Sequence, residues 1–99
     1  MVLETRDKNK LIKAAQKGNK DAIEYLISQN MDIVYAKAKF FFIKGLDKDD
    51  VIQEGRIGLY KAIRDYNENK AASFRGFSQL CVHSQLVSAI KKANRQKHV

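Results

Sequence analysis

The chain has 99 residues, no proline, five glycines and a formal net charge of +8. This length predicts a single domain over residues 1–99, and the scarcity of helix-breaking residues favours an all-α fold. No stretch approaches the roughly 20 apolar residues of a membrane span, and the one cysteine, Cys81, excludes an internal disulfide, so we expect a cytoplasmic protein without a membrane partner.

The first two of four predicted helices lie in the N-terminal half. The first covers about residues 8–16, with Asp7 as its N-cap and Gly18–Asn19 as its end. The second begins between Asn19 and Asp21, and Asp21–Glu24 fits a capping box. Its apolar periodicity predicts a long helix that runs to about Phe42.

Two features of this second helix are unusual. An irregularity is expected near residues 29–31, and Gly45 is expected to end the helix. The run Phe40–Ile43 is too apolar to lie entirely on a surface. We expect most of it to pack in the core against the third and fourth helices, with a partner-binding face as the alternative.

The last two helices follow in the C-terminal half. Asp47 is a candidate N-cap for a third helix that covers residues 50–66. A polar turn at residues 67–72 follows, and Ser73 then caps a fourth helix from Phe74 to about Gln96.

The third helix has two apolar faces, more than a helix needs for packing against its own domain. The face expected in the core contains Val51, Gly55, Gly58, Leu59, Ala62 and Tyr66, widened by Ile52 and Ile63. Gly55 and Gly58 each cost about 1 kcal/mol in a helix interior, which indicates close approach of another backbone. Ile57 and Tyr60 lie on the opposite, polar face, where an apolar centre with a polar rim predicts a protein-docking surface.

The fourth helix is aromatic first and basic later. Phe74, Phe77, Leu80 and Cys81 recur at helical spacing, and the helix then becomes rich in amides and cations. The 31 residues after Glu68, the last acid, carry +6, against +2 for the first 68 residues. Aromatic rings beside cations can hold unstacked bases and phosphates, so this helix predicts a nucleic-acid partner. We expect Phe74 to lie in the core and Cys81 to be a small buried apolar residue. The alternative interpretation of the basic segment is a solubilising tail.

One segment of the third helix resembles a known family. The string Ile-Gln-Glu-Gly-x-Ile-Gly-Leu at residues 52–59 resembles the polymerase-binding region 2.2 of bacterial sigma-70-family sigma factors. The residues that carry the resemblance are Asp50, Ile52, Gln53, Glu54, Gly55, Ile57, Gly58, Leu59, Lys61 and Ala62. The segments 73–81 and 89–98 look most like the sigma-H type of sporulation and stationary phase. The resemblance implies a four-helix region 2 domain, and we expect a fragment that lacks the domain reading the −35 element.

The resemblance also implies a polymerase partner. The third helix would dock on the clamp-helix coiled coil of the β′ subunit of core RNA polymerase. The implied polymerase-binding residues are Asp50, Gln53, Glu54, Arg56, Ile57, Tyr60 and Lys61. Arg56 stands where an asparagine is usual in the family. An anti-sigma factor is a further candidate partner.

For DNA, the resemblance implies capture and melting of the −10 promoter element through flipped bases of its non-template strand. The residues implied at the base pocket are Tyr66, Asn67, Lys70, Phe77 and Leu80; Ser84, Gln85 and Ser88 would read the upstream edge, and Lys91, Lys92, Arg95 and Lys97 complete the DNA-binding set. Leu80 and Cys81 stand where primary sigma factors carry two tryptophans, and Phe77 stands at a tyrosine position. Less aromatic surface implies weaker intrinsic melting and a stricter promoter requirement.

Enzymatic chemistry is not expected. The sequence has no P-loop, dinucleotide-binding turn or nucleophile elbow, and we expect no cofactor and no small-molecule substrate. His83 and His98 lack neighbouring metal-ligand residues, and the aspartates at 47–50 are explained by a helix start. Two alternatives to a sigma domain stay open. One is a stand-alone helical module that inserts its fourth helix in the major groove. The other is a polymerase-binding regulator without promoter melting.

Overall fold

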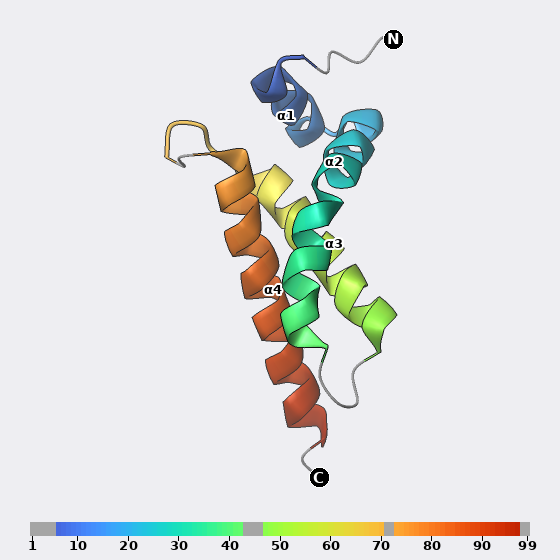
Figure 1. Ribbon diagram of the computed structural model, residues 1–99. Coiled ribbons are helices and arrows are strands. Elements are labelled where there is room, and N and C mark those ends of the chain that lie inside the picture. The colour runs from blue at the N-terminus through green and yellow to red at the C-terminus, as the bar shows by residue number, and fades with distance from the viewer. Residues whose placement is uncertain (1–5, 43–46, 71–72, 98–99) are drawn as a thin grey trace.

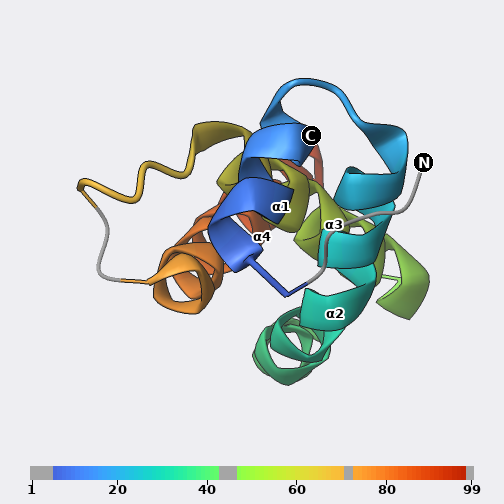
Figure 2. The same ribbon diagram turned by 90° about the horizontal axis from the view of Figure 1, so that it is seen from above.

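The computed structural model describes residues 6–42, 47–70 and 73–97, with side chains described as far as Asn94. Its elements are α1 (Lys8–Gln16), α2 (Lys20–Ala38), the 3₁₀ helix η1 (Lys39–Phe41), α3 (Lys48–Asp65) and α4 (Phe74–Lys97). Helices α3 and α4 lie side by side, α2 crosses both, and α1 covers one end (Figures 1 and 2). The described residues form no strand, so the predicted all-α, four-helix domain is confirmed. Within these same ranges, no helix has both the length and the apolar character needed to cross a membrane.

Local capping chemistry sets most of the helix starts. The side chain of Asp7 accepts from Lys10 N, that of Asp47 from Asp49 N, and that of Ser73 from Gly76 N. These bonds satisfy backbone N–H groups that have no partner within the first turn. The three predicted caps are therefore confirmed, although α3 begins at Lys48 and ends at Asp65, rather than spanning 50–66.

The expectations for α2 need three corrections. Its N-cap is Asn19, whose Oδ1 accepts from Ala22 N at 3.1 Å, so Asp21 lies within the first turn and heads no capping box. Residues 29–31 are regular α-helix, and the buried Asn30 satisfies its side-chain amide there by donating to Leu26 O at 2.7 Å. The α-helix ends at Ala38 and tightens into η1 before Phe42. Ile43 and Gly45 lie outside the described residues.

The aromatic run 40–42 is mostly on the surface, so the expectation of a core cluster was wrong. The Phe40 side chain is 80% exposed and Phe42 is also exposed, whereas Phe41 is partly buried and packs edge-on against His83 with ring centroids 5.5 Å apart. Consecutive residues in a 3₁₀ helix point about 120° apart, since a turn contains three residues. One residue of three can therefore face the core.

Two glycines of α3 allow the close approach of its neighbours, Gly55 that of α2 and Gly58 that of α4. A Cβ at Gly58 would lie 2.7 Å from Val82 Cα and 3.0 Å from Cys81 O, and a Cβ at Gly55 would lie 2.5 Å from Val34 Cγ1. Any side chain at Gly58 would thus collide with the α4 backbone. The predicted close approach is confirmed. Most of the predicted core stripe is also confirmed: Val51, Gly55, Gly58, Leu59, Ala62 and Ile63 are buried, whereas Ile52 and Tyr66 are only partly buried.

Contacts between distant segments hold both ends of the α3–α4 connection. Gln16 of α1 donates through Nε2 to Ile63 O and Tyr66 O, both at 2.9 Å, and so satisfies carbonyl groups at the C-terminus of α3. Arg75, at the start of α4, binds Asp32 at 2.6 Å and Asn30 at 3.1 Å. The polar turn between the two helices therefore begins and ends at anchored positions.

Candidate functional site

The outward side of α3 presents apolar side chains to solvent. Ile57 is 43% exposed and Tyr60 is 47% exposed, while Gln53 is exposed four residues before Ile57. Arg64 falls on the same side, because it follows Tyr60 by four residues and Ile57 by seven. We define Gln53, Ile57, Tyr60 and Arg64 as the docking face. Asp50 is exposed at its edge, and Arg56 is partly buried.

Helical periodicity predicted Arg64 on this side of the helix, but Arg64 was not among the residues implied for polymerase binding. Its guanidinium binds the neighbouring Asp65 through Nε at 2.8 Å and through Nη2 at 2.9 Å. Hydrogen bonding to Arg64 lowers the pKa of Asp65 below its ordinary value. The helical spacing from Ile57 and Tyr60 was the sequence signal that could have found Arg64.

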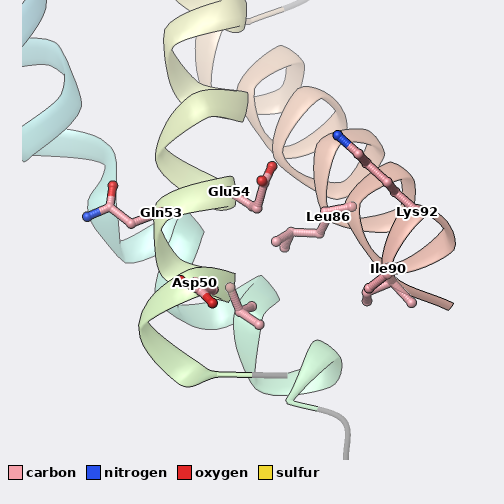
Figure 3. A pocket seen from close by; sticks show the side chains of 9 residues that line it. Asp50, Gln53, Glu54, Leu86, Ile90 and Lys92 are labelled. Carbon is pink, nitrogen blue, oxygen red and sulfur yellow. The ribbon is translucent and has the colours of Figure 1, made fainter. Parts of the chain in front are cut away.

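Two residues predicted for the polymerase surface turn toward α4 instead. Lys61 Nζ donates to Gln85 Oε1 at 2.6 Å, and Gln85 Nε2 donates to Glu54 Oε2 at 2.7 Å. Figure 3 shows Glu54 directed toward α4, whereas the side chain of Gln53 extends away from α4 in this view, although Gln53 also lines the groove drawn there. We call this arrangement of Glu54, Gln85 and Lys61 the Gln85 bridge. It brings together residues that the sequence had divided between two partners.

A groove opens between the start of α3 and the second half of α4 (Figure 3). It is lined by Asp50, Val51, Gln53 and Glu54 from α3 and by Leu86, Ala89, Ile90, Lys92 and Ala93 from α4. Its carboxylates lie on α3, and Lys92 supplies a cation from α4. The groove therefore connects the edge of the docking face with the basic half of α4.

The residues predicted for a base pocket converge at the other end of α4. One pocket is lined by Asp65, Asn67, Lys70, Ser73, Gly76, Phe77 and Leu80, and so contains four of the five predicted residues. The fifth, Tyr66, supports the pocket from behind, because its ring packs 5.9 Å from Phe77 and 5.4 Å from Phe74. We define Asn67, Lys70, Phe77 and Leu80 as the aromatic pocket. Leu80 is 70% exposed, whereas Phe74 is buried in the core, as the sequence predicted.

A second depression continues from the aromatic pocket along α4. It is lined by Lys61, Asp65, Leu80, Cys81, Ser84, Gln85 and Ser88, and it shares Asp65 and Leu80 with the pocket. Ser84, Gln85 and Ser88, which were predicted to act together, therefore lie together. Cys81 is partly exposed rather than fully buried, and burial of its sulfur raises the pKa of the thiol, so it stays protonated at neutral pH.

The basic half of α4 is less uniform than its sequence indicates. Lys91 and Lys92 are exposed, while the side chains of Arg95 and Lys97 lie outside the described residues. Arg75 is paired with Asp32, and its hydrogen bonds lower the pKa of that carboxyl. Its charge is therefore compensated. In the ranges with described side chains, no group of three or more histidine, cysteine, aspartate or glutamate residues could hold a metal ion.

Comparisons with known proteins identify the family of the chain. The family model described as Sigma-70 region 2 matches residues 26–96. The chain is 47% identical to the RNA polymerase sigma-H factor of Bacillus subtilis (strain 168) over 89 residues, which are 90% of this chain and 41% of that protein. It is 33% identical to the RNA polymerase sigma factor SigA of Mycoplasma genitalium over 75 residues, which are 76% of this chain and 15% of that protein. The chain thus spans less than half the length of these relatives.

Proposed function

Because the chain belongs to the sigma-70 region 2 family, we propose that it binds core RNA polymerase and recognises and helps to open the −10 element of promoters. In this proposal the docking face of α3 contacts the clamp-helix coiled coil of the β′ subunit. The aromatic pocket and the adjoining side of α4 contact the non-template strand. The similarity to sigma-H factors supports a role in sporulation or stationary-phase transcription.

The observation that carries the proposal is the exposure of Ile57 and Tyr60 at the centre of a helix that already buries a full apolar stripe. A half-exposed tyrosine and isoleucine, flanked by Gln53 and Arg64, have the composition of an interface core with a polar rim. A stand-alone DNA-binding module would have no use for such a face. The coiled-coil partner would bury it.

DNA opening follows from differential binding. Extruding a base costs a few kcal/mol, and stacking on an aromatic side chain returns roughly 1–3 kcal/mol per base. The aromatic pocket offers the Phe77 ring beside the Lys70 ammonium and the Asn67 amide. A strand that binds this pocket only when unpaired shifts the equilibrium toward the open form.

The direct test is binding of the purified chain to an isolated β′ clamp coiled coil, compared with Tyr60→Ala. We expect a loss of about 10- to 30-fold, since tyrosines at interface centres are frequent hot spots. Tyr35→Ala is the matched control, because Tyr35 is an equally exposed tyrosine on α2. Equal affinity of the Tyr60→Ala variant and the wild-type chain would contradict docking through this face.

One observation supports a second candidate function. Leu80 and Cys81 offer no aromatic ring at positions where primary sigma factors carry tryptophans, which favours a polymerase-binding regulator that does not melt promoters. That candidate predicts binding to the coiled coil without any preference for −10 single strand over random single strand. A preference of several-fold for the −10 strand would exclude it.

A further inference from the structure

Gln85 of α4 is held from both sides by side chains of α3. Its Oε1 accepts from Lys61 Nζ at 2.6 Å, and its Nε2 donates to Glu54 Oε2 at 2.7 Å. Both contacts are partly buried, and hydrogen bonds to charged groups are stronger than neutral ones and stronger where water is scarce. The Gln85 bridge is therefore a defined arrangement and not a passing surface contact.

The two charges determine which way round the amide lies. An ammonium group only donates and a carboxylate only accepts. If the amide turned over, its NH₂ group would face the Lys61 ammonium and its oxygen would face the Glu54 carboxylate. Two charge-assisted hydrogen bonds would become two repulsive contacts. Gln85 is thus restricted to one amide orientation, which an exposed glutamine without charged partners would not be.

The bridge leaves part of the amide free. A glutamine amide has two N–H donors and two acceptor lone pairs, and the bridge uses one of each. One donor and one acceptor remain, on a side chain that lines the same depression as Ser84 and Ser88. In the major groove of a base pair, adenine presents an N7 acceptor beside an N6–H donor, the pair that a glutamine binds in bidentate fashion.

We propose that Glu54 and Lys61 are positioning residues of the DNA-binding surface, which fix the Gln85 amide so that it selects adenine at the upstream, duplex edge of the −10 element. This inference rests on the proposed function, because it requires α4 to lie against promoter DNA. It assigns Glu54 and Lys61 to the DNA side of the domain. Gln53, the neighbour of Glu54, remains on the docking face.

The test is a base-preference measurement on the 99-residue chain. The DNA probe is double-stranded upstream and carries the −10 element as a single non-template strand. Its base pairs at the edge of the duplex are randomised, and the sequences that the chain binds are selected. The position whose preference depends on Gln85 is identified with Gln85→Ala. The selected adenine is then replaced by 7-deazaadenine, which lacks only the N7 acceptor. Affinities for both DNAs are measured with wild type, Glu54→Ala, Lys61→Met and the control Gln53→Ala.

The expected result is a preference for adenine over its 7-deaza analogue of about 5-fold or more, the lower end of what a bidentate contact gives. We expect wild type and Gln53→Ala to show it, and Glu54→Ala and Lys61→Met to lose most of it. A purely structural bridge would change the unfolding free energy without changing this ratio. If only Gln85→Ala lost the preference for adenine over 7-deazaadenine, the positioning role of Glu54 and Lys61 would be overturned, while base reading by Gln85 would stand.

Two other outcomes would also overturn the inference and can be told apart. A wild-type chain that binds −10 DNA without any Gln85-dependent base preference refutes the inference but not the proposed function. A wild-type chain with no preference for −10 DNA over unrelated DNA refutes DNA recognition itself, and the inference with it. Binding of the same variants to the β′ coiled coil, measured in parallel, reports on the polymerase part of the proposed function separately.

Discussion

Helices α3 and α4 share one tightly packed interface but differ in what they present to solvent. At the interface, Gly58 lies directly against the backbone of Val82. Outward, α3 exposes Ile57 and Tyr60 among side chains of both signs, whereas α4 exposes Leu80 and then Lys91 and Lys92 without an acid on the helix. An apolar centre with mixed charges suits a protein partner, and an aromatic pocket followed by cations suits a nucleic acid.

The difference shows how one small domain can serve two partners. The interface between the helices determines their relative position, so a change there should affect both outward surfaces. A change on one outward surface should affect one partner only. The following substitutions test this division, beginning with the largest expected effect.

Gly58→Ala changes the shared interface of α3 and α4 and should have the largest effect on stability. The added methyl group would meet the α4 backbone, so the helices must separate, and we expect the unfolding free energy to fall by about 2–3 kcal/mol. Urea denaturation measures this change. Gly55→Ala should also lower the unfolding free energy, because its methyl group would lie 2.5 Å from Cγ1 of Val34, a buried side chain that is branched at Cβ and cannot rotate away freely. If Gly58→Ala left the unfolding free energy unchanged, α3 and α4 would not approach each other so closely.

Phe77→Ala should affect only the α4 surface. We expect affinity for −10 single strand to fall by about 1–3 kcal/mol, because one stacking ring is lost, while affinity for random duplex changes little. Fluorescence anisotropy with the two DNAs measures both. Phe77→Tyr keeps the ring and should retain wild-type affinity for the single strand. Equal losses on single strand and duplex would indicate general electrostatics in place of a base pocket.

Ile57→Ala should affect only the α3 surface. Removing a half-exposed side chain from the interface centre should weaken coiled-coil binding by about 1 kcal/mol and leave DNA affinity unchanged. Because Ile57 is not in the core, the unfolding free energy should change by less than about 0.5 kcal/mol. Isothermal titration calorimetry and urea denaturation measure these quantities. A large loss of stability would show that Ile57 packs within the domain.

Lys92→Ala tests the charge of α4. Each phosphate contact that is lost should lower the slope of log affinity against log salt by about 0.7–0.9, a modest change in affinity at one salt concentration. Titrations at several salt concentrations measure the slope. Lys20→Ala, at an exposed lysine on the start of α2, should leave it unchanged. If Lys92→Ala also left it unchanged, Lys92 would not contact phosphate.

Asp32→Asn tests the anchor between α2 and the start of α4 and should have the smallest effect. Hydrogen bonding to Arg75 lowers the pKa of Asp32 below its ordinary value of 3.8. A lowered folded pKa contributes stability that is present above the unfolded pKa and lost as pH falls through the folded pKa. The variant should therefore lose less stability than the wild type between about pH 5 and 2. Urea denaturation across this pH range measures the stability of both proteins. If the stability of wild type and variant fell equally with pH, the contact between Asp32 and Arg75 would be contradicted.

Much of the fold was predictable because its signals are local. Caps such as Asp47 and Ser73 bind N–H groups of the next turn, and the glycines at 55 and 58 recur on the core side of one helix. The core stripe and the exposure of Ile57 and Tyr60 followed from the same periodicity. The aromatic run 40–42 was misjudged because consecutive helical side chains point about 100–120° apart, so an apolar run of this kind cannot face the core as a whole.

The contacts that sequence reasoning missed join residues far apart in the chain. The Arg75–Asp32 pair spans 43 residues, and Gln85 reaches Lys61 and Glu54 across 24 and 31 residues. Such contacts depend on the rotation of each helix about its axis, which close packing at Gly55 and Gly58 determines. The resemblance to sigma factors supplied residue roles but did not separate Glu54 and Lys61 from their neighbours on α3.

The most direct test of the account is a crossed binding experiment with two double variants, Ile57→Ala with Tyr60→Ala and Phe77→Ala with Lys92→Ala. Each is measured against the β′ clamp coiled coil and against −10 single-stranded DNA. The account predicts that the first loses only the coiled coil and the second loses only the DNA. If either variant, while folded, lost both ligands or neither, the assignment of separate partners to α3 and α4 would be contradicted.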